Sequence, residues 1–239
     1  SRKWQLADAI DFVALELEGA GLSVNRQGYD LDSEVVAQNL SGEVLGGSAR
    51  NEILIVGAHL DSPQGSPGAS AAAGVATLIV LASRLRTADP ARTLRFVVFS
   101  LCEGELAETD AAGSRVYARA ALAREEQPVA TVALDSLGHY AGAGEQQQPP
   151  ELVANWPTGS DFVTLVATER DRAWLDRAAD AFALGASIPA VAAVAAAPVP
   201  GLGPTDAWGF ASEGIPTVRV TDTARLRDPE HGSPTDLPD

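Results

Sequence analysis

The sequence is poor in the residues that build metal clusters and covalent cross-links. It has one cysteine, no methionine and three histidines, which are His59, His139 and His231. A single cysteine excludes an internal disulfide and any zinc site built from several cysteines. Three histidines provide few ligands for a metal centre. The chemistry that is available therefore depends on the side chains around each histidine.

Basic residues are also scarce, with 17 Lys and Arg against 32 Asp and Glu and a formal net charge of −15. An acidic surface repels nucleic acid and anionic membranes, so we exclude both as partners. No apolar run approaches the roughly 20 residues of a membrane-spanning helix. The first residues do not resemble a signal peptide, although the chain starts at Ser1 rather than Met. We expect a soluble protein and leave both a cytoplasmic location and an exported precursor open.

Hydrophobic periodicity indicates strands that alternate with helices. Wholly apolar runs are typical of strands buried on both faces, and such runs cover 53–58, 94–100, 129–134 and 217–220. Helical periodicity covers 3–21, 71–85, 113–124 and 175–184, and a hairpin-like pair covers 22–26, 34–39 and 43–45. This order predicts a three-layer α/β/α fold with a central mixed, mainly parallel sheet.

The length of 239 residues and the apolar content of 46% suit one domain that spans 1–239. Segments 62–70, 141–160 and 198–208 are rich in Gly, Pro and Gln and are predicted to be loops, with 142–150 as a surface excursion. The most apolar stretch, 188–200, is rich in alanine and is given no element.

Titratable residues lie at the predicted carboxyl ends of the strands. The carboxyl ends of parallel strands meet at one edge of a sheet, where ligands bind. A role in capping or in a turn could explain any one such residue. It explains less well why the ends of four strands all carry one, because buried carboxylates need partners. The residues are His59, Asp61, Cys102, Glu103, Asp135, Asp206 and Asp222.

Four sequence blocks carry a resemblance to a known family. They are GAHLDSPQGSPGASAAAGVATLIVLA (57–82), RTLRFVVFSLCEGELAETDAAGSRVYA (92–118), VALDSLGH (132–139) and PGLGPTDAWGFASEGIPTVRVTDTARLRDPEHGSPTDLPD (200–239). In this order and spacing they resemble the co-catalytic dizinc aminopeptidases, whose relatives include the glutaminyl cyclases. The resemblance covers nearly the whole chain and implies the zinc-aminopeptidase-like fold.

The resemblance also assigns roles to individual positions. It implies that His59 binds one zinc ion and that Asp61 orients it, as partners of metal-binding histidines do. Asp135 matches a further ligand and Glu103 matches a ligand of the second zinc. The general base of the family stands one residue before that glutamate, where this chain has Cys102.

Two ligand positions of the family depart from its pattern. The aspartate that bridges both zinc ions matches the stretch 68–74, and no acidic residue occurs between Asp61 and Asp89. The final histidine ligand matches Gly232, with His231 one residue early. Because two-metal catalysis needs both ions held together, we expect no zinc cofactor and no classical aminopeptidase activity.

Three functions stay open from these residues. The first is a repurposed, metal-independent enzyme for acyl transfer, hydrolysis or cyclisation, with Cys102 as a nucleophile beside His59 and Asp135, and with Glu103 as a further catalytic candidate. Against it stands the simpler interpretation that Cys102 is a small buried hydrophobe.

The second function is a binding pseudoenzyme with an acidic cleft for a small-molecule or peptide-like ligand. Its candidate binding residues are Asp61, Asp206, Trp208 and His231. The third is a weak hydrolase with a single metal ion on His59, Glu103 and Asp135.

Several carboxylates that meet without a cation repel one another. We therefore expect at least one of them to keep a proton through a raised pKa. Arg225 and Arg227 are the candidates to compensate the negative charge instead.

Overall fold

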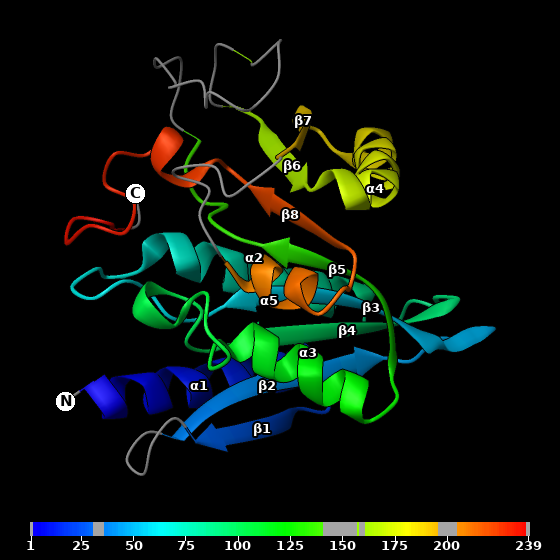
Figure 1. The fold of residues 1–239 in the computed structure, drawn as a ribbon, viewed down its shortest axis with the longest axis horizontal. Helices are drawn as coiled ribbons and strands as arrows, with labels where there is room; N and C mark the ends of the chain where they lie inside the picture. The colour runs from blue at the N-terminus through cyan, green and yellow to red at the C-terminus, as the bar shows by residue number, and fades with distance from the viewer. Residues whose placement is uncertain (1, 31–35, 141–156, 158–160, 196–204, 238–239) are drawn as a thin grey trace.

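The structure, a computed structural model, describes residues 2–30, 36–140, 157, 161–195 and 205–237. Its centre is an eight-stranded sheet in the order β1-β2-β4-β3-β5-β8-β6-β7 (Figure 1). The strands are β1 (Asn25–Asp30), β2 (Val36–Val44), β3 (Ala49–His59), β4 (Arg92–Phe99), β5 (Gln127–Leu134), β6 (Val163–Ala167), β7 (Ala190–Val194) and β8 (Thr217–Thr221). The helices are α1 (Arg2–Gly19), α2 (Ala69–Leu85), α3 (Gly113–Ala123), α4 (Arg172–Gly185) and α5 (Asp206–Ser212).

The middle of the sheet is parallel and its flanks are not. Strands β4, β3, β5 and β8 run parallel to their neighbours within this group. On one side β2 pairs with β4 and β1 with β2 in antiparallel fashion, and on the other side β6 is antiparallel to β8. The predicted fold class, a mixed and mainly parallel sheet with helices on both faces, is confirmed.

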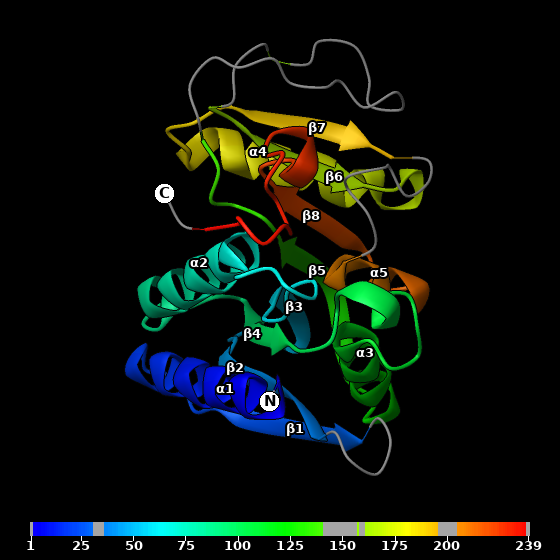
Figure 2. The same cartoon turned by 90° about the vertical axis from the view of Figure 1, so that its left-hand side faces the viewer.

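The helices cover the two faces of the sheet separately, as Figure 2 shows, with α1 and α2 on one face and α3 and α5 on the other. Leu17 of α1 and Leu78 of α2 are fully buried in one cluster with Phe96. On the opposite face the ring of Phe99 lies 5.9 Å from Tyr117 of α3 and 5.5 Å from Phe210 of α5. Phe96 and Phe99 are an odd number of positions apart in β4 and therefore point to opposite faces of the sheet, so this strand contributes to both cores.

The strands predicted from apolar runs and the four predicted helices are all present, but other elements differ from the prediction. The hairpin-like pair predicted at 22–26, 34–39 and 43–45 is formed by β1, which begins later than predicted, and by β2 as one continuous strand. β6 and the short α5 were not predicted, and residues 206–208, predicted as loop, begin α5. β7 lies in the alanine-rich stretch, where the sequence AVAAV has two valines but is mostly alanine, a residue that is depleted in strands. The predicted excursion at 142–150 lies outside the described residues. Within the described part of the chain, no helix is both long and apolar enough to cross a membrane.

Candidate functional site

The carboxyl ends of β3, β4, β5 and β8 meet at one edge of the sheet, and the backbone there is strained. Leu101, Ser136, Thr223 and Ala224 follow these strands with positive φ angles of 60°, 52°, 82° and 48°. Residues other than glycine seldom adopt this conformation, and where they do they tend to cluster at functional sites. The strain marks the same edge that the strand-end residues marked in the sequence.

His59 is the central side chain of this edge and is buried, with 4% of its surface exposed. Its Nδ1 atom lies 2.9 Å from the carbonyl oxygen of Asp61 and so donates a hydrogen bond to it. Its Nε2 atom lies 3.3 Å from Oδ1 of Asp135 and 3.7 Å from Oε1 of Glu103. The prediction that His59 and Asp135 lie within hydrogen-bonding reach is confirmed.

Asp61 holds a different partner from the expected one. Its carboxylate accepts hydrogen bonds from the backbone N–H groups of Cys102 (2.9 Å) and Glu103 (2.8 Å), while Nδ1 of His59 is 3.8 Å away. The carboxylate turns to these amides because the turn after β4 presents both of them, and the carbonyl group of Asp61 orients the histidine instead. Asp61 therefore anchors the turn that carries Cys102 and Glu103.

Asp135 is surrounded by protein groups on both carboxylate oxygens. Oδ1 faces His59 and accepts a hydrogen bond from Ser136 Oγ at 3.0 Å, and Oδ2 lies 2.5 Å from Nη2 of Arg219. Arg219 was not predicted as part of the site. A signal was available in the sequence, because an arginine at the centre of the buried strand TVRVT needs a buried partner.

The charges around His59 shift several pKa values. Burial opposes the protonation of His59, but Asp135 outweighs it and holds the pKa of His59 well above its usual range. Burial also acts against the charge of Asp135, yet Arg219 and His59 keep the pKa of Asp135 far below the ordinary aspartate value. Burial raises the pKa of Glu103, and the nearby charge of His59 counteracts part of that rise.

Asp206 lies at the first position of α5 and is fully buried. Burial, reinforced by the charge of Asp135, raises its pKa to about 7, although His59 works in the opposite direction. Asp206 is thus partly protonated near neutral pH, in agreement with the expectation that at least one acid of the cluster has a raised pKa.

The expected compensation by Arg225 and Arg227 differs in the structure. Arg227 lies near Asp222: its Nη1 donates to the carbonyl oxygen of His139 at 3.2 Å, and the N–H of His139 donates to Asp222 at 2.9 Å. Burial raises the pKa of Asp222, and the charge of Arg227 acts against this rise. The side chain of Arg225 lies outside the described residues. Among the described side chains, Arg219 is a cation that reaches the candidate site and pairs with Asp135, because its strand leads directly into this edge of the sheet.

Cys102 lies within the core beside the site. It is 1% exposed and belongs to the apolar cluster that contains Phe99 and Phe210. Its Sγ atom lies 3.9 Å from the carbonyl oxygen of Ser100. Burial, with the charges of Asp61 and Asp206, raises the pKa of this thiol well above its usual value.

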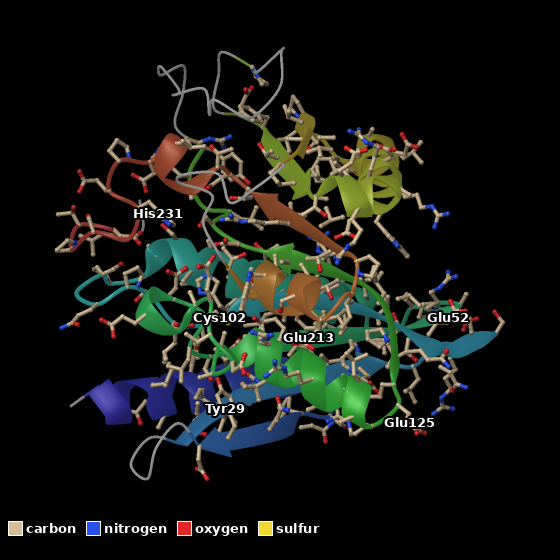
Figure 3. The ribbon with its side chains drawn as sticks, viewed as in Figure 1. Tyr29, Glu52, Cys102, Glu125, Glu213 and His231 are labelled. Carbon is tan, nitrogen blue, oxygen red and sulfur yellow. The ribbon has the colours of Figure 1, made fainter. Side chains whose placement is uncertain are left out.

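The remaining candidate binding residues lie around this edge. Trp208 is half-buried in α5, and the guanidinium of Arg115 lies 5.0 Å from its ring centroid. His231 is half-buried in the C-terminal segment, and Figure 3 shows it well separated from Cys102 in that view. The structure gathers His59, Asp61, Glu103 and Asp135 closely and sets His231 in a separate segment.

The two stretches that the resemblance matched to the bridging aspartate and to the final histidine meet at Asp236. Its carboxylate accepts hydrogen bonds from Ser66 Oγ (3.1 Å), Ser70 N (3.2 Å), Ser70 Oγ (2.9 Å) and Gly232 N (3.1 Å). This clamp was not predicted. It holds the C-terminal segment against the start of α2 through serine and backbone groups.

Comparison with known proteins identifies the class. Residues 39–234 match the model of peptidase family M28, and the chain belongs to this family. It is 28% identical over 205 residues to the uncharacterized protein YfbL of Escherichia coli K12, a match that covers 81% of this chain and 62% of that protein. The chain therefore spans about three fifths of the length of this relative.

Solved structures share the fold, and several of them are named aminopeptidases. The aminopeptidase from Aneurinibacillus sp. strain AM-1 matches with a TM-score of 0.59 and 22% identity, over 85% of this chain and 43% of that chain. LapB from Legionella pneumophila matches with a TM-score of 0.67 and 16% identity, over 98% and 58% of the two chains. A leucine aminopeptidase precursor from Bacteroides thetaiotaomicron matches with a TM-score of 0.63 and 15% identity, over 95% of this chain and 79% of that chain.

Proposed function

We propose that this chain is a metal-free member of peptidase family M28 whose former catalytic edge binds the amino group of a peptide or amino-acid-like ligand. The observation that carries the proposal is the difference between the two neighbouring acids. Asp135 is buried and neutralised by Arg219, whereas the side chain of Glu103 is 25% exposed and lies 3.7 Å from His59. Glu103 is thus the acid of the pair that remains accessible to a cation from solvent.

The side chains present do not fit the two zinc ions that the family implies. Apart from His59, Asp135 and Glu103, the matched positions supply no ligand, since 68–74 contains only Gly, Ala and Ser, and Gly232 replaces the histidine. One oxygen of Asp135 is also held by an arginine at 2.5 Å. A zinc site of the catalytic type needs about three protein ligands for each ion, and this set falls short for two.

The position of Glu103 supports an amine as the ligand. Burial raises the pKa of this carboxyl group, so an ammonium group beside it would favour the charged form and gain an ion pair. Several solved relatives are named aminopeptidases, and an amino terminus is the group that such enzymes recognise. A binding protein of this kind would still recognise the amino group but would no longer hydrolyse the peptide bond.

The experiment compares two ligands that differ only in the amino group, leucinamide and N-acetyl-leucinamide, by thermal unfolding. At about 100 times its dissociation constant a ligand stabilises the native state by about 2.7 kcal/mol. We expect stabilisation by leucinamide alone, its loss in Glu103→Gln, and no hydrolysis of an aminoacyl-nitroanilide. Equal stabilisation by both compounds, or turnover that a chelator abolishes, would contradict the proposal.

A weak single-metal hydrolase is the second candidate, and one observation favours it. His59 Nε2, Asp135 Oδ1 and Glu103 Oε1 converge, with the histidine 3.3 Å and 3.7 Å from the two oxygens. Three protein ligands leave a fourth position for water in a catalytic zinc site. Metal analysis of the purified protein separates the candidates, since only this one expects stoichiometric metal and a lower melting temperature after chelation.

The metal-independent enzyme with Cys102 as nucleophile has less support. A nucleophilic cysteine reacts as the thiolate, and neighbouring groups lower the pKa of its thiol. Here burial raises the pKa of the Cys102 thiol and only 1% of the residue is exposed. These properties favour the buried-hydrophobe interpretation of Cys102.

A further inference from the structure

Arg219 lies at the centre of β8, the strand that joins β5 to β6. It is opposite Ala133 of β5 and Val166 of β6, and 7% of its surface is exposed. Val218 and Val220 flank it and pack into the apolar clusters on the sheet. A buried guanidinium is costly unless a negative partner accompanies it, so its partner explains its presence.

The partner is Asp135, which follows the end of β5. The distance from Arg219 Nη2 to Asp135 Oδ2 is 2.5 Å, and both side chains are buried, with exposed fractions of 8% and 3%. The other oxygen of Asp135 faces His59 and Ser136. Protein groups therefore contact both oxygens of the carboxylate, so a metal ion at this position would have to displace one of them.

The charge of Arg219 reaches the neighbouring acids as well. Burial raises the pKa values of Glu103 and Asp206, and the positive charge of Arg219 is among the effects that limit both rises. Asp61, Glu103, Asp135 and Asp206 are among the acids at this edge of the sheet, and the strand of Arg219 fixes this cation among them.

We propose that Arg219 is a built-in counter-ion that supplies the positive charge of the absent metal ion and keeps Asp135 from coordinating one. The proposal rests on the metal-free function proposed above and extends it, because it names the residue that makes the edge stable without metal. It also explains why an acidic cluster of this kind persists beside ligand positions that the chain has lost.

The test is substitution of Arg219, with zinc chloride as the probe. In Arg219→Met the oxygen of Asp135 is released, and we expect zinc to bind at about one ion per chain. At about 100 times the dissociation constant, zinc should then raise the melting temperature by roughly 5–10 °C. The wild type and Arg219→Lys, which keeps the charge, should show neither effect.

Arg95 provides the matched control. It is an equally buried arginine of the sheet, 9% exposed, and pairs with Glu43 and Glu126 away from this edge. Arg95→Met should lower the melting temperature without creating a response to zinc. In the double variant Arg219→Met/Asp135→Asn the response to zinc should disappear, because the carboxylate ligand is gone.

The outcomes separate this proposal from the proposed function. Stoichiometric zinc on the wild type contradicts the metal-free function itself. A wild type without zinc together with an Arg219→Met variant that gains no zinc binding contradicts only the role of Arg219. If Arg219→Met folds only with zinc or only together with Asp135→Asn, the counter-ion role is supported. If neither Arg219→Met nor the double variant folds, with or without zinc, the counter-ion role is overturned.

Discussion

Burial decides what the thiol of Cys102 can do. A free cysteine in an apolar environment is a small hydrophobe, whereas reactive cysteines lie in partly exposed, electropositive surroundings. The cluster that contains Phe99, Tyr117 and Phe210 surrounds Cys102, and the acids Asp61 and Asp206 add negative charge nearby. Both effects hold the thiol in its protonated form.

We therefore expect iodoacetamide at near-neutral pH to label Cys102 more slowly than it labels a free model thiol such as glutathione, because the raised pKa leaves little thiolate. In denaturant the rates should become similar. Mass spectrometry over a time course gives both rates. Faster labelling of the native protein than of glutathione would revive the nucleophile hypothesis.

Asp206 predicts a specific dependence of stability on pH. Its folded pKa of about 7 lies above the unfolded value of about 3.9, so between these pH values the native state holds a proton that the unfolded state has released. Its contribution to the free energy of unfolding therefore falls as pH rises through this window, by up to about 1.4 kcal/mol per pH unit.

Urea unfolding of the wild type and Asp206→Asn at several pH values between about 4 and 7 checks this prediction. The difference in unfolding free energy between the two proteins should change in favour of the variant as pH rises. Asp180→Asn, at an exposed position of α4, is the control and should follow the wild type. A constant difference across the window would show that Asp206 is ionised throughout.

At the scale of residues, the sequence predicted which side chains lie together at the edge of the sheet. It did not predict which hydrogen bonds and ion pairs they form. His59, Glu103 and Asp135 could be placed together because each follows a buried parallel strand. The role of the Asp61 carboxylate could not be foreseen, since it depends on two backbone N–H groups of a strained turn. Arg219 was predictable in principle, as a charged residue within a buried strand.

Among the elements, α5 depends on its contact with α3. Gly209 of α5 lies against α3 so closely that a Cβ atom there would be 2.2 Å from Ser114 Oγ and 2.5 Å from the backbone nitrogen of Arg115. The absence of a side chain allows the two helices to meet beside Asp206 and Trp208.

Gly209→Ala should therefore force the helices apart and lower the unfolding free energy by about 1–3 kcal/mol. Gly19→Ala is the control, because its Cβ atom meets nothing within 4 Å, and an alanine there should be neutral or slightly stabilising. Chemical denaturation of the two variants measures both effects. Equal stabilities would mean that α5 can shift without loss.

Most of the elements with a strong pattern were predicted, although β6 was missed despite the strand-favouring sequence VTLVA. β3, β4 and β5 are apolar runs between turn signals, and α2 has a long periodic face. β7 and α5 were missed because the first is mostly alanine and the second has only seven residues. Packing against the sheet, rather than local preference, determines both.

For the whole molecule, the net charge of −15 predicts a salt effect. Like charges repel one another in the compact state, and salt screens this repulsion over about 10 Å at 0.1 M. We expect the melting temperature to rise when sodium chloride increases from about 10 to about 150 mM at near-neutral pH. A fall would mean that screening of attractive ion pairs outweighs the relief of repulsion.

The place of β8 in the sheet has a consequence for the order of events during synthesis. β8 lies between β5 and β6 although it follows both in the chain, so the sheet stays in two parts until residues 217–221 have left the ribosome. Contacts this distant in sequence form slowly, and incomplete sheets expose edges that aggregate. Arg219 arrives with this last strand, so the nascent chain carries its acids to the growing edge before the cation that balances them exists.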